Sequence, residues 1–104
     1  METWKVSQPG EAGKACIEFL RTRDLSAGMY RLPAGGVDAQ NPHGEEEIYY
    51  VIRGRAQFRA GQQDVAVSAP DVLFVPRGEP HRFHDIAEDL DVPVLFAPAE
   101  GSRK

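Results

Sequence analysis

Alternating hydrophobic and polar residues form a series of short segments along the chain, and glycine and proline separate these segments. The segments are too short for typical helices. Valine, isoleucine, phenylalanine and tyrosine, which favour strands, are frequent in them. The pattern predicts strands over residues 15–20, 28–32, 48–52, 56–59, 64–67, 72–75, 81–84 and 92–96. Short strands with turn signals about every 8–12 residues are typical of an all-β sandwich or barrel.

Three segments fit this pattern less well. Residues 11–20 and 85–91 leave room for a turn or two of helix. Residues 1–13 are polar and interrupted by glycine and proline, so we expect them to form an arm or an edge strand that carries Trp4. A chain of 104 residues can bury about 65% of its extended surface, which is enough for one core and not for two. We therefore predict a single domain over residues 1–104.

Composition and charge exclude several classes of protein. No apolar run approaches the roughly 20 residues that span a bilayer, and residues 1–15 lack the hydrophobic stretch of a signal peptide. A net charge of −4 argues against non-specific nucleic-acid binding, which needs a basic surface. The single cysteine, Cys16, excludes an internal disulfide and fits a reducing compartment; we expect it to be a small buried residue on a strand. We thus predict a cytoplasmic protein with no membrane or nucleic-acid partner.

The residues with the most informative chemistry lie in one segment, residues 35–54. His43 and Glu47 are four positions apart, so they share a face whether the segment is a strand or a helix. Pro42 and Gly44 disfavour a helix, and the Ile-Tyr-Tyr-Val-Ile run after Glu47 favours a strand. One face of this strand carries Asn41, His43, Glu45, Glu47, Tyr49 and Val51.

A buried glutamate on that face requires a paired charge or a metal ion, because an isolated carboxylate is costly inside a protein. A turn over residues 76–80 places a matching partner, His81, at the start of another strand. Imidazole and carboxylate groups together are ligands of zinc, iron, manganese and nickel. His43, Glu47 and His81 are therefore candidates for binding a divalent metal ion.

These two segments resemble the two sequence motifs of the cupin family. The first motif, G-x5-H-x-H-x3,4-E-x6-G, is matched at Gly35, Asn41, His43, Glu47 and Gly54. The second, G-x5-P-x-G-x2-H-x3-N, is matched at Pro70, Pro76, Gly78, His81 and Asp85. Three positions depart from the motifs, namely Asn41, Pro70 and Asp85. The resemblance covers about residues 28–97. It implies a small cupin, that is, a double-stranded β-helix or jelly-roll-like barrel with a metal ion held inside by His43, Glu47 and His81.

Asn41 is the departure with the largest consequence for the metal site. It replaces the first histidine of the motif, and an amide oxygen is a weaker ligand than imidazole. Three roles are open to it: coordinating the metal, binding the metal through water, or only hydrogen bonding. Two histidines and one glutamate are the ligand count of a non-haem iron facial triad, which leaves positions open for substrate.

Aromatic and acidic residues next to the ligand positions are candidates for the surrounding cavity. Tyr49 and Phe83 follow ligand positions by two residues, so they either line the cavity or belong to the barrel core. A proton-transfer partner would come from the rim of the cavity, and Tyr49, Glu45 and Asn41 are the candidates.

Other charged residues near the motifs are expected outside the cavity. Short charge runs are usually solvated, so we expect Glu46 to face outward and Glu45 to stand at the strand entrance, neither as a ligand. His84 is opposite in parity to His81 and should face away from the interior. Arg31 is expected to be exposed, which is the commoner state of arginine.

The family resemblance does not select one reaction. The first hypothesis is a metal-dependent enzyme that acts on a small organic molecule, as a dioxygenase, isomerase, cyclase or decarboxylase. The second is a module that binds or senses a small ligand without turnover, with or without metal. The third is a structural role with a vestigial site.

A homodimer is the expected assembly. Exposed sheet edges invite uncontrolled pairing and therefore need cover, and closed two-fold association is the default for soluble oligomers. Residues 1–13 suit an edge strand laid along a neighbouring subunit. The alternative is an arm that folds back on its own barrel or has no fixed position.

Overall fold

The computed structural model describes residues 1–5, 16–39 and 44–102, and every element in these ranges is a strand. The seven strands are β1 (Cys16–Arg21), β2 (Ser26–Leu32), β3 (Glu46–Tyr50), β4 (Arg53–Ala60), β5 (Gln63–Ser68), β6 (Val72–Val75) and β7 (His81–Ala97). The predicted all-β class is confirmed. Within the described ranges we find no helix of the length and hydropathy needed to cross a membrane.

Strand β7 joins two of the predicted strands and runs through the segment between them. The alternative of a turn or two of helix at residues 85–91, which the sequence left open, is therefore excluded. Ile86 and Leu90 are both buried and four residues apart, a spacing that places two residues on one face of a strand as well as of a helix. The strand is irregular here, because its register with β4 shifts twice opposite this segment and Asp85 adopts a positive φ of 46°.

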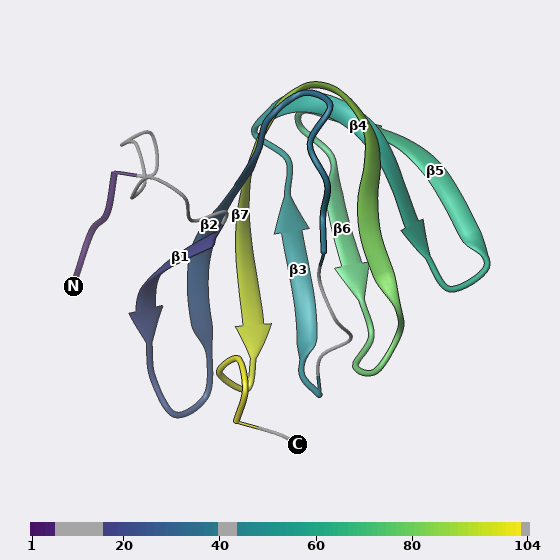
Figure 1. Ribbon diagram of the computed structural model, residues 1–104. Coiled ribbons are helices and arrows are strands. Elements are labelled where there is room, and N and C mark those ends of the chain that lie inside the picture. The colour runs from purple at the N-terminus through teal and green to yellow at the C-terminus, as the bar shows by residue number, and fades with distance from the viewer. Residues whose placement is uncertain (6–15, 40–43, 103–104) are drawn as a thin grey trace.

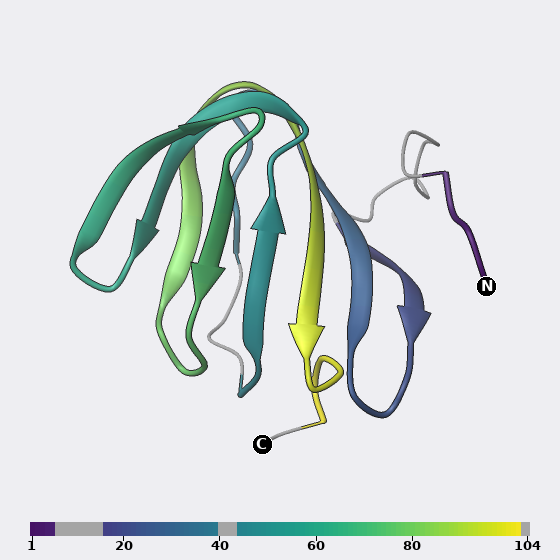
Figure 2. The same cartoon turned by 180° about the vertical axis from the view of Figure 1, so that it is seen from behind.

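All strand pairs are antiparallel, and β7 belongs to both halves of the molecule. Its second half lies between β2 and β3 in the order β1-β2-β7-β3-β6, while its first half pairs with β4, which in turn pairs with β5. Figure 1 shows β7 passing over the top of the molecule from its light green half to its yellow half, and Figure 2 shows the same path from behind. The long strand thus carries side chains from one end of the barrel interior to the other.

A single hydrophobic cluster fills the space that these strands enclose, and it draws on every strand from β2 to β7. Tyr49, Val51 and Val92 have no exposed surface at all. Gly54, at the start of β4, shows how closely the strands approach each other. It has a φ of +99°, and a Cβ added there would lie 2.3 Å from the carbonyl oxygen of Asp89, so only glycine fits.

The edge of the sheet differs from expectation at Cys16. This residue lies on a strand, as predicted, but it is exposed rather than buried, because β1 is the last strand in the order that the described residues form and pairs there with β2 alone. Partial desolvation, and secondly the carboxylate of Glu100, raise the pKa of the thiol to about 11. The cysteine is therefore held as a thiol and is a poor nucleophile.

The expected arm over residues 1–13 is described only in part. Trp4 packs against Phe19 of its own chain, with 5.4 Å between ring centroids, and residues 6–13 lie outside the described ranges. A homodimer formed through this arm therefore stays a prediction.

Candidate metal centre

The candidate site begins with the alternation of β3. Glu45, Glu47 and Tyr49 are buried, whereas Glu46 and Ile48 between them are exposed. This is the period of two that a strand imposes on its side chains, and it confirms the predicted inward face from Glu45 to Val51. Asn41 and His43, predicted on the same face, lie outside the described residues.

A tight turn before β7 positions His81, the second candidate ligand of the site. Gly78 has a φ of +78° in the turn that leads into β7, a conformation that glycine adopts without strain. His81, the first residue of β7, is 6% exposed. Its Nε2 atom lies 3.1 Å from Oε1 of Glu47 and 3.1 Å from the hydroxyl oxygen of Tyr49. Glu47 and Tyr49, two candidates from the sequence, thus contact the same ring nitrogen of His81.

The other ring nitrogen of His81 determines what Nε2 can do. Nδ1 lies 2.8 Å from the carbonyl oxygen of Glu79, and a carbonyl can only accept, so Nδ1 carries the proton. In the neutral ring, the lone pair is then on Nε2, next to Glu47. A histidine that binds a metal ion is commonly oriented in this way, by a hydrogen bond from its other ring nitrogen.

The spacing of the two candidate ligands also suits a metal ion. Two donor atoms bound to one metal ion at about 2.0–2.2 Å stand about 3.0 Å apart in octahedral geometry and about 3.4 Å apart in tetrahedral geometry. The 3.1 Å between Glu47 Oε1 and His81 Nε2 lies between these values. Among the described residues, no three His, Cys, Asp or Glu side chains are grouped to hold a metal. The expected third ligand, His43, lies outside those residues.

The carboxylates that act on His81 are those of Glu47 and Asp38, and both side chains are buried. Every described lysine and arginine is exposed or half-buried. Burial lowers the pKa of His81, but hydrogen bonds to Glu47 and the Glu79 carbonyl, and the charges of Glu47 and Asp38, outweigh it, so the pKa is raised. The interior therefore favours a positive charge at this point.

Asp38 is a part of the site that the sequence analysis missed. Its Oδ1 accepts a hydrogen bond from the Tyr30 hydroxyl, and its Oδ2 accepts one from the backbone N–H of Phe83, at 2.9 Å. It thereby ties β2 to the start of β7, two residues from His81. Asp38 lies in a loop, where no periodicity marks a residue as inward-facing.

Aromatic rings form one wall of the site. The Tyr49 ring lies 5.3 Å from that of Phe83 and 5.9 Å from the imidazole of His81, measured between centroids. Phe58, on β4, completes the cluster at 4.7 Å from Phe83. The sequence pointed to Tyr49 and Phe83 but not to Phe58, whose place follows from the pairing of β4 with β7.

The remaining candidates lie apart from this group. Glu45 is 1% exposed, not solvated, and its Oε1 accepts a hydrogen bond from the Gly101 N–H at 3.0 Å. His84 faces outward, as expected, toward Asp64. Arg31 is half-buried and pairs with Asp91 at 3.4 Å, across the register of β2 and β7.

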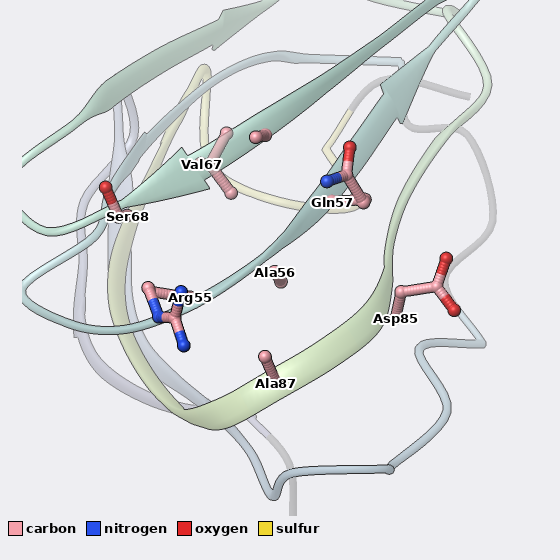
Figure 3. A pocket seen from close by; sticks show the side chains of 8 residues that line it. Arg55, Ala56, Gln57, Val67, Ser68, Asp85 and Ala87 are labelled. Carbon is pink, nitrogen blue, oxygen red and sulfur yellow. The ribbon is translucent and has the colours of Figure 1, made fainter.

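A cavity of about 320 Å³ lies elsewhere, over β4, β5 and the middle of β7 (Figure 3). It contains none of the residues that the sequence singled out as ligands. Arg55 on its wall already pairs with Glu88 at 2.9 Å. We therefore regard this cavity as separate from the candidate metal centre.

Comparison with known proteins identifies the family. The sequence model of the Cupin domain matches residues 28–97, and the chain belongs to the cupin family. It is 45% identical over 86 residues to an uncharacterised protein of Streptomyces coelicolor, an alignment that covers 83% of this chain and 82% of that protein.

Two further relatives illustrate the range of the likeness. The chain is 39% identical over 57 residues to the oxalate-binding protein of Thermotoga maritima, covering 55% of this chain and 47% of that protein. The crystal structure of a conserved protein from Klebsiella pneumoniae with a double-stranded β-helix domain superposes with a TM-score of 0.83 at 19% identity, covering 100% of this chain and 94% of that one. The fold is thus the double-stranded β-helix expected of a cupin.

Proposed function

We propose that the protein binds a divalent metal ion through Glu47, His81 and His43, and acts as an enzyme on a small organic molecule inside the barrel. The observation that carries this proposal is the buried pair of Glu47 Oε1 and His81 Nε2, 3.1 Å apart. The Glu79 carbonyl holds His81 in the tautomer that a metal requires. The resemblance of the sequence to the cupin motifs supports His43 as the third ligand.

The charge of the interior supports a cation rather than an uncharged ligand alone. Three carboxylates, those of Asp38, Glu45 and Glu47, are buried with one imidazole among the described residues. Asp38 and Glu45 accept hydrogen bonds from other parts of the chain. A divalent ion beside Glu47 would place a positive charge next to the carboxylate that contacts His81.

The chain's own residues define what such a site can do. A bound metal would supply Lewis acidity and a template for substrate. The Tyr49 hydroxyl, 3.1 Å from His81 Nε2, can hold or donate a proton at its phenolic oxygen. The rings of Phe58 and Phe83 exclude water from one side, which strengthens polar interactions within the site.

A second candidate function is the binding of a small carboxylate without turnover. The likeness to an oxalate-binding protein favours it, since an anion is the natural ligand of a metal with open positions. Incubating the metal-loaded protein with oxalate, precipitating the protein with acid and measuring the oxalate recovered at several times distinguishes the two functions for this compound. Binding with full recovery of oxalate supports a binding module, and loss of oxalate with time supports an enzyme.

The metal site is tested by elemental analysis. We would load the full chain with zinc, manganese, iron or nickel, dialyse it against a chelator, and measure the metal that remains. We expect one ion per chain, and a large loss of metal in His81→Ala and Glu47→Gln, because each removes one of three ligands. His84→Ala is the matched control, since His84 lies on the same strand but on its outer face.

Full retention of metal in both His81→Ala and Glu47→Gln would refute the site. Equal loss in His84→Ala would show that the metal binds the surface instead. Circular dichroism of each variant establishes that the barrel is folded before its metal content is compared.

A further inference from the structure

The two candidate ligands of the described site belong to different halves of the molecule. Glu47 on β3 pairs with Val75 of β6 and with Phe96 in the second half of β7. His81 stands at the start of β7, where the strand pairs with β4. The hydrogen bonds of the sheet hold each residue within its own half. The 3.1 Å between the Glu47 carboxylate and the His81 ring therefore depends also on contacts that cross between the halves.

The loop over residues 33–38 makes such a crossing. It follows β2 and runs along the first half of β7, to which three hydrogen bonds join it in succession. Their partners on β7, in the order of the loop, are Asp89, Ile86 and Phe83, so the loop runs antiparallel to the strand. The last bond, 2.9 Å from the Phe83 N–H to Oδ2 of Asp38, is the nearest of the three to the start of β7.

Asp38 joins the two halves through both of its carboxylate oxygens. Oδ2 accepts the hydrogen bond from the Phe83 N–H, and Oδ1 accepts one from the hydroxyl of Tyr30. Tyr30 belongs to β2 and pairs with the second half of β7, as Glu47 does. The carboxylate thus connects the half that carries Glu47 to the backbone two residues from His81.

The surroundings of this connection make it strong. The exposed fractions of Asp38, Tyr30 and Phe83 are 5, 7 and 1%, so water does not compete for either hydrogen bond. Hydrogen bonds to a charged acceptor in such an interior are stronger than those between neutral groups. No described group of three His, Cys, Asp or Glu side chains is arranged to hold a metal, so Asp38 does not join Glu47 and His81 as a ligand.

We propose that Asp38 is a positioning residue of the metal centre, which holds the His81 imidazole at its distance from Glu47 by fixing the backbone of Phe83. This inference rests on the proposed function. A binding site keeps its affinity only while its donor atoms are held within about 0.5 Å of the productive geometry. Without the carboxylate, the start of β7 loses its connection to β2, and the imidazole can move away from Glu47.

The first measurement is the zinc dissociation constant of the full chain, by competition with a coloured chelator. In Asp38→Ala we expect it to rise about tenfold, at the lower end of the about 10–100-fold losses that contacts around metal ligands cause. Asp38→Asn, which keeps one acceptor oxygen, should have a smaller effect in the same direction. Asp89→Asn is the matched control, because Asp89 also accepts a backbone N–H of this loop, at 2.8 Å, but is exposed and lies further along β7.

The spectrum of a bound ion separates a positioning role from a loss of stability alone. Cobalt(II) in place of zinc has visible absorption bands that depend on the arrangement of its ligands. With the site saturated, Asp38→Asn should shift these bands. Val67→Ala removes buried apolar volume on β5, so it should lower the melting temperature and keep the wild-type spectrum.

Tyr30→Phe tests the other end of the connection. It removes the donor to Oδ1 and leaves the bond to Phe83, so the zinc dissociation constant should rise less than in Asp38→Ala. A chain that combines both substitutions should bind zinc as Asp38→Ala does, because a connection that is already absent cannot be weakened again. Effects that multiply would show that Tyr30 and Asp38 act independently, which would overturn the proposal.

The remaining outcomes distinguish this inference from the proposed function. A wild-type chain that binds no zinc, or a His81→Ala chain that retains it, would overturn both. Loss of zinc in His81→Ala together with wild-type affinity in both Asp38 variants would overturn the positioning role alone. An unchanged cobalt spectrum in Asp38→Asn would do the same, since the carboxylate would then serve stability only. Circular dichroism verifies folding, and Asp38→Asn replaces Asp38→Ala throughout if the latter does not fold.

Discussion

Two histidines of β7, three residues apart, have opposite surroundings. His81 faces the interior, where its Nε2 lies 3.1 Å from Glu47 and its side chain is 1% exposed. His84 faces outward, where its Nε2 lies 2.9 Å from Asp64 and its Nδ1 lies 3.0 Å from Asp85. Both are histidine–carboxylate pairs of nearly the same length, so pair geometry alone does not separate them.

The difference lies in what surrounds each pair. Water competes for His84 and its partners, and exposed ion pairs of this kind contribute about 0–1 kcal/mol. Around His81, aromatic rings replace water, so each polar contact is stronger and each missing one costs more. The buried pair of His81 and Glu47 therefore supports a functional site inside the barrel. The exposed pair of His84 and Asp64 is an ordinary surface ion pair.

The largest expected effect is the difference in free energy of unfolding between a substitution on the inner face of β7 and one on its outer face. Phe83 is 1% exposed and packs against Tyr49 and Phe58, so Phe83→Ala should lower the free energy of unfolding by about 3–5 kcal/mol. Arg82, the exposed neighbour, is the control, and Arg82→Ala should change it by less than about 0.5 kcal/mol. Urea denaturation of the metal-free chain measures both. Equal costs would contradict the inward orientation of Phe83.

The second effect concerns metal and the two histidines. A ligand that binds only the folded state stabilises it, by about 2.7 kcal/mol at one hundred times its dissociation constant. A saturating divalent ion should therefore raise the melting temperature of the wild-type chain and of His84→Ala, but not that of His81→Ala. An unchanged melting temperature of the wild-type chain across zinc, manganese, iron and nickel would count against an internal site.

A smaller effect comes from the hydroxyl that faces His81. Tyr49→Phe removes the contact with Nε2 at 3.1 Å, and we expect a loss of about 0.5–1.5 kcal/mol in the metal-free chain. Tyr50→Phe, the next residue but on the outer face, should leave the free energy of unfolding unchanged. Chemical denaturation of the two variants in parallel measures the difference. A similar loss in both would mean that the Tyr49 hydroxyl contributes no special interaction.

The sequence predicted the inner face of β3 because strict alternation marks it. Glu47 and Tyr49 follow the same period of two as the hydrophobic residues, and the turn before His81 is marked by proline and glycine. By contrast, the register of β4 against β7, which brings Phe58 beside His81, depends on bulges that leave no local pattern. The position of Phe58 beside His81 therefore could not be predicted from the sequence.

Two differences between sequence and structure have a common physical origin. The alternative of a turn of helix at residues 85–91 and the expected burial of Cys16 were both inferred from local composition. Residues 85–91 lie in a strand because they pair with distant residues of β4, and Cys16 is exposed because β1 is at the end of the sheet formed by the described strands. Tertiary pairing, which local sequence does not encode, decided both.

The smallest effect should appear in the pH dependence of stability, and it belongs to His84. A hydrogen bond to Asp64, opposed by slight burial and aided by Asp85, raises the pKa of His84 above its ordinary value. The unfolded chain has the ordinary pKa of about 6.5, so the folded state binds the proton more tightly. The stabilisation from this pair is complete below that value and is lost as the pH rises through the raised pKa of the folded state.

We therefore compare the free energy of unfolding of the wild-type chain with that of His84→Ala at several pH values. The two should differ by at most about 1 kcal/mol near pH 5.5, and the difference should shrink toward alkaline pH. His81 titrates equally in both proteins, so its contribution cancels in the difference. Asp64→Asn should reproduce most of the effect, because it removes the principal partner. A difference that grows with pH would show that the two outer carboxylates do not hold His84 in its protonated form.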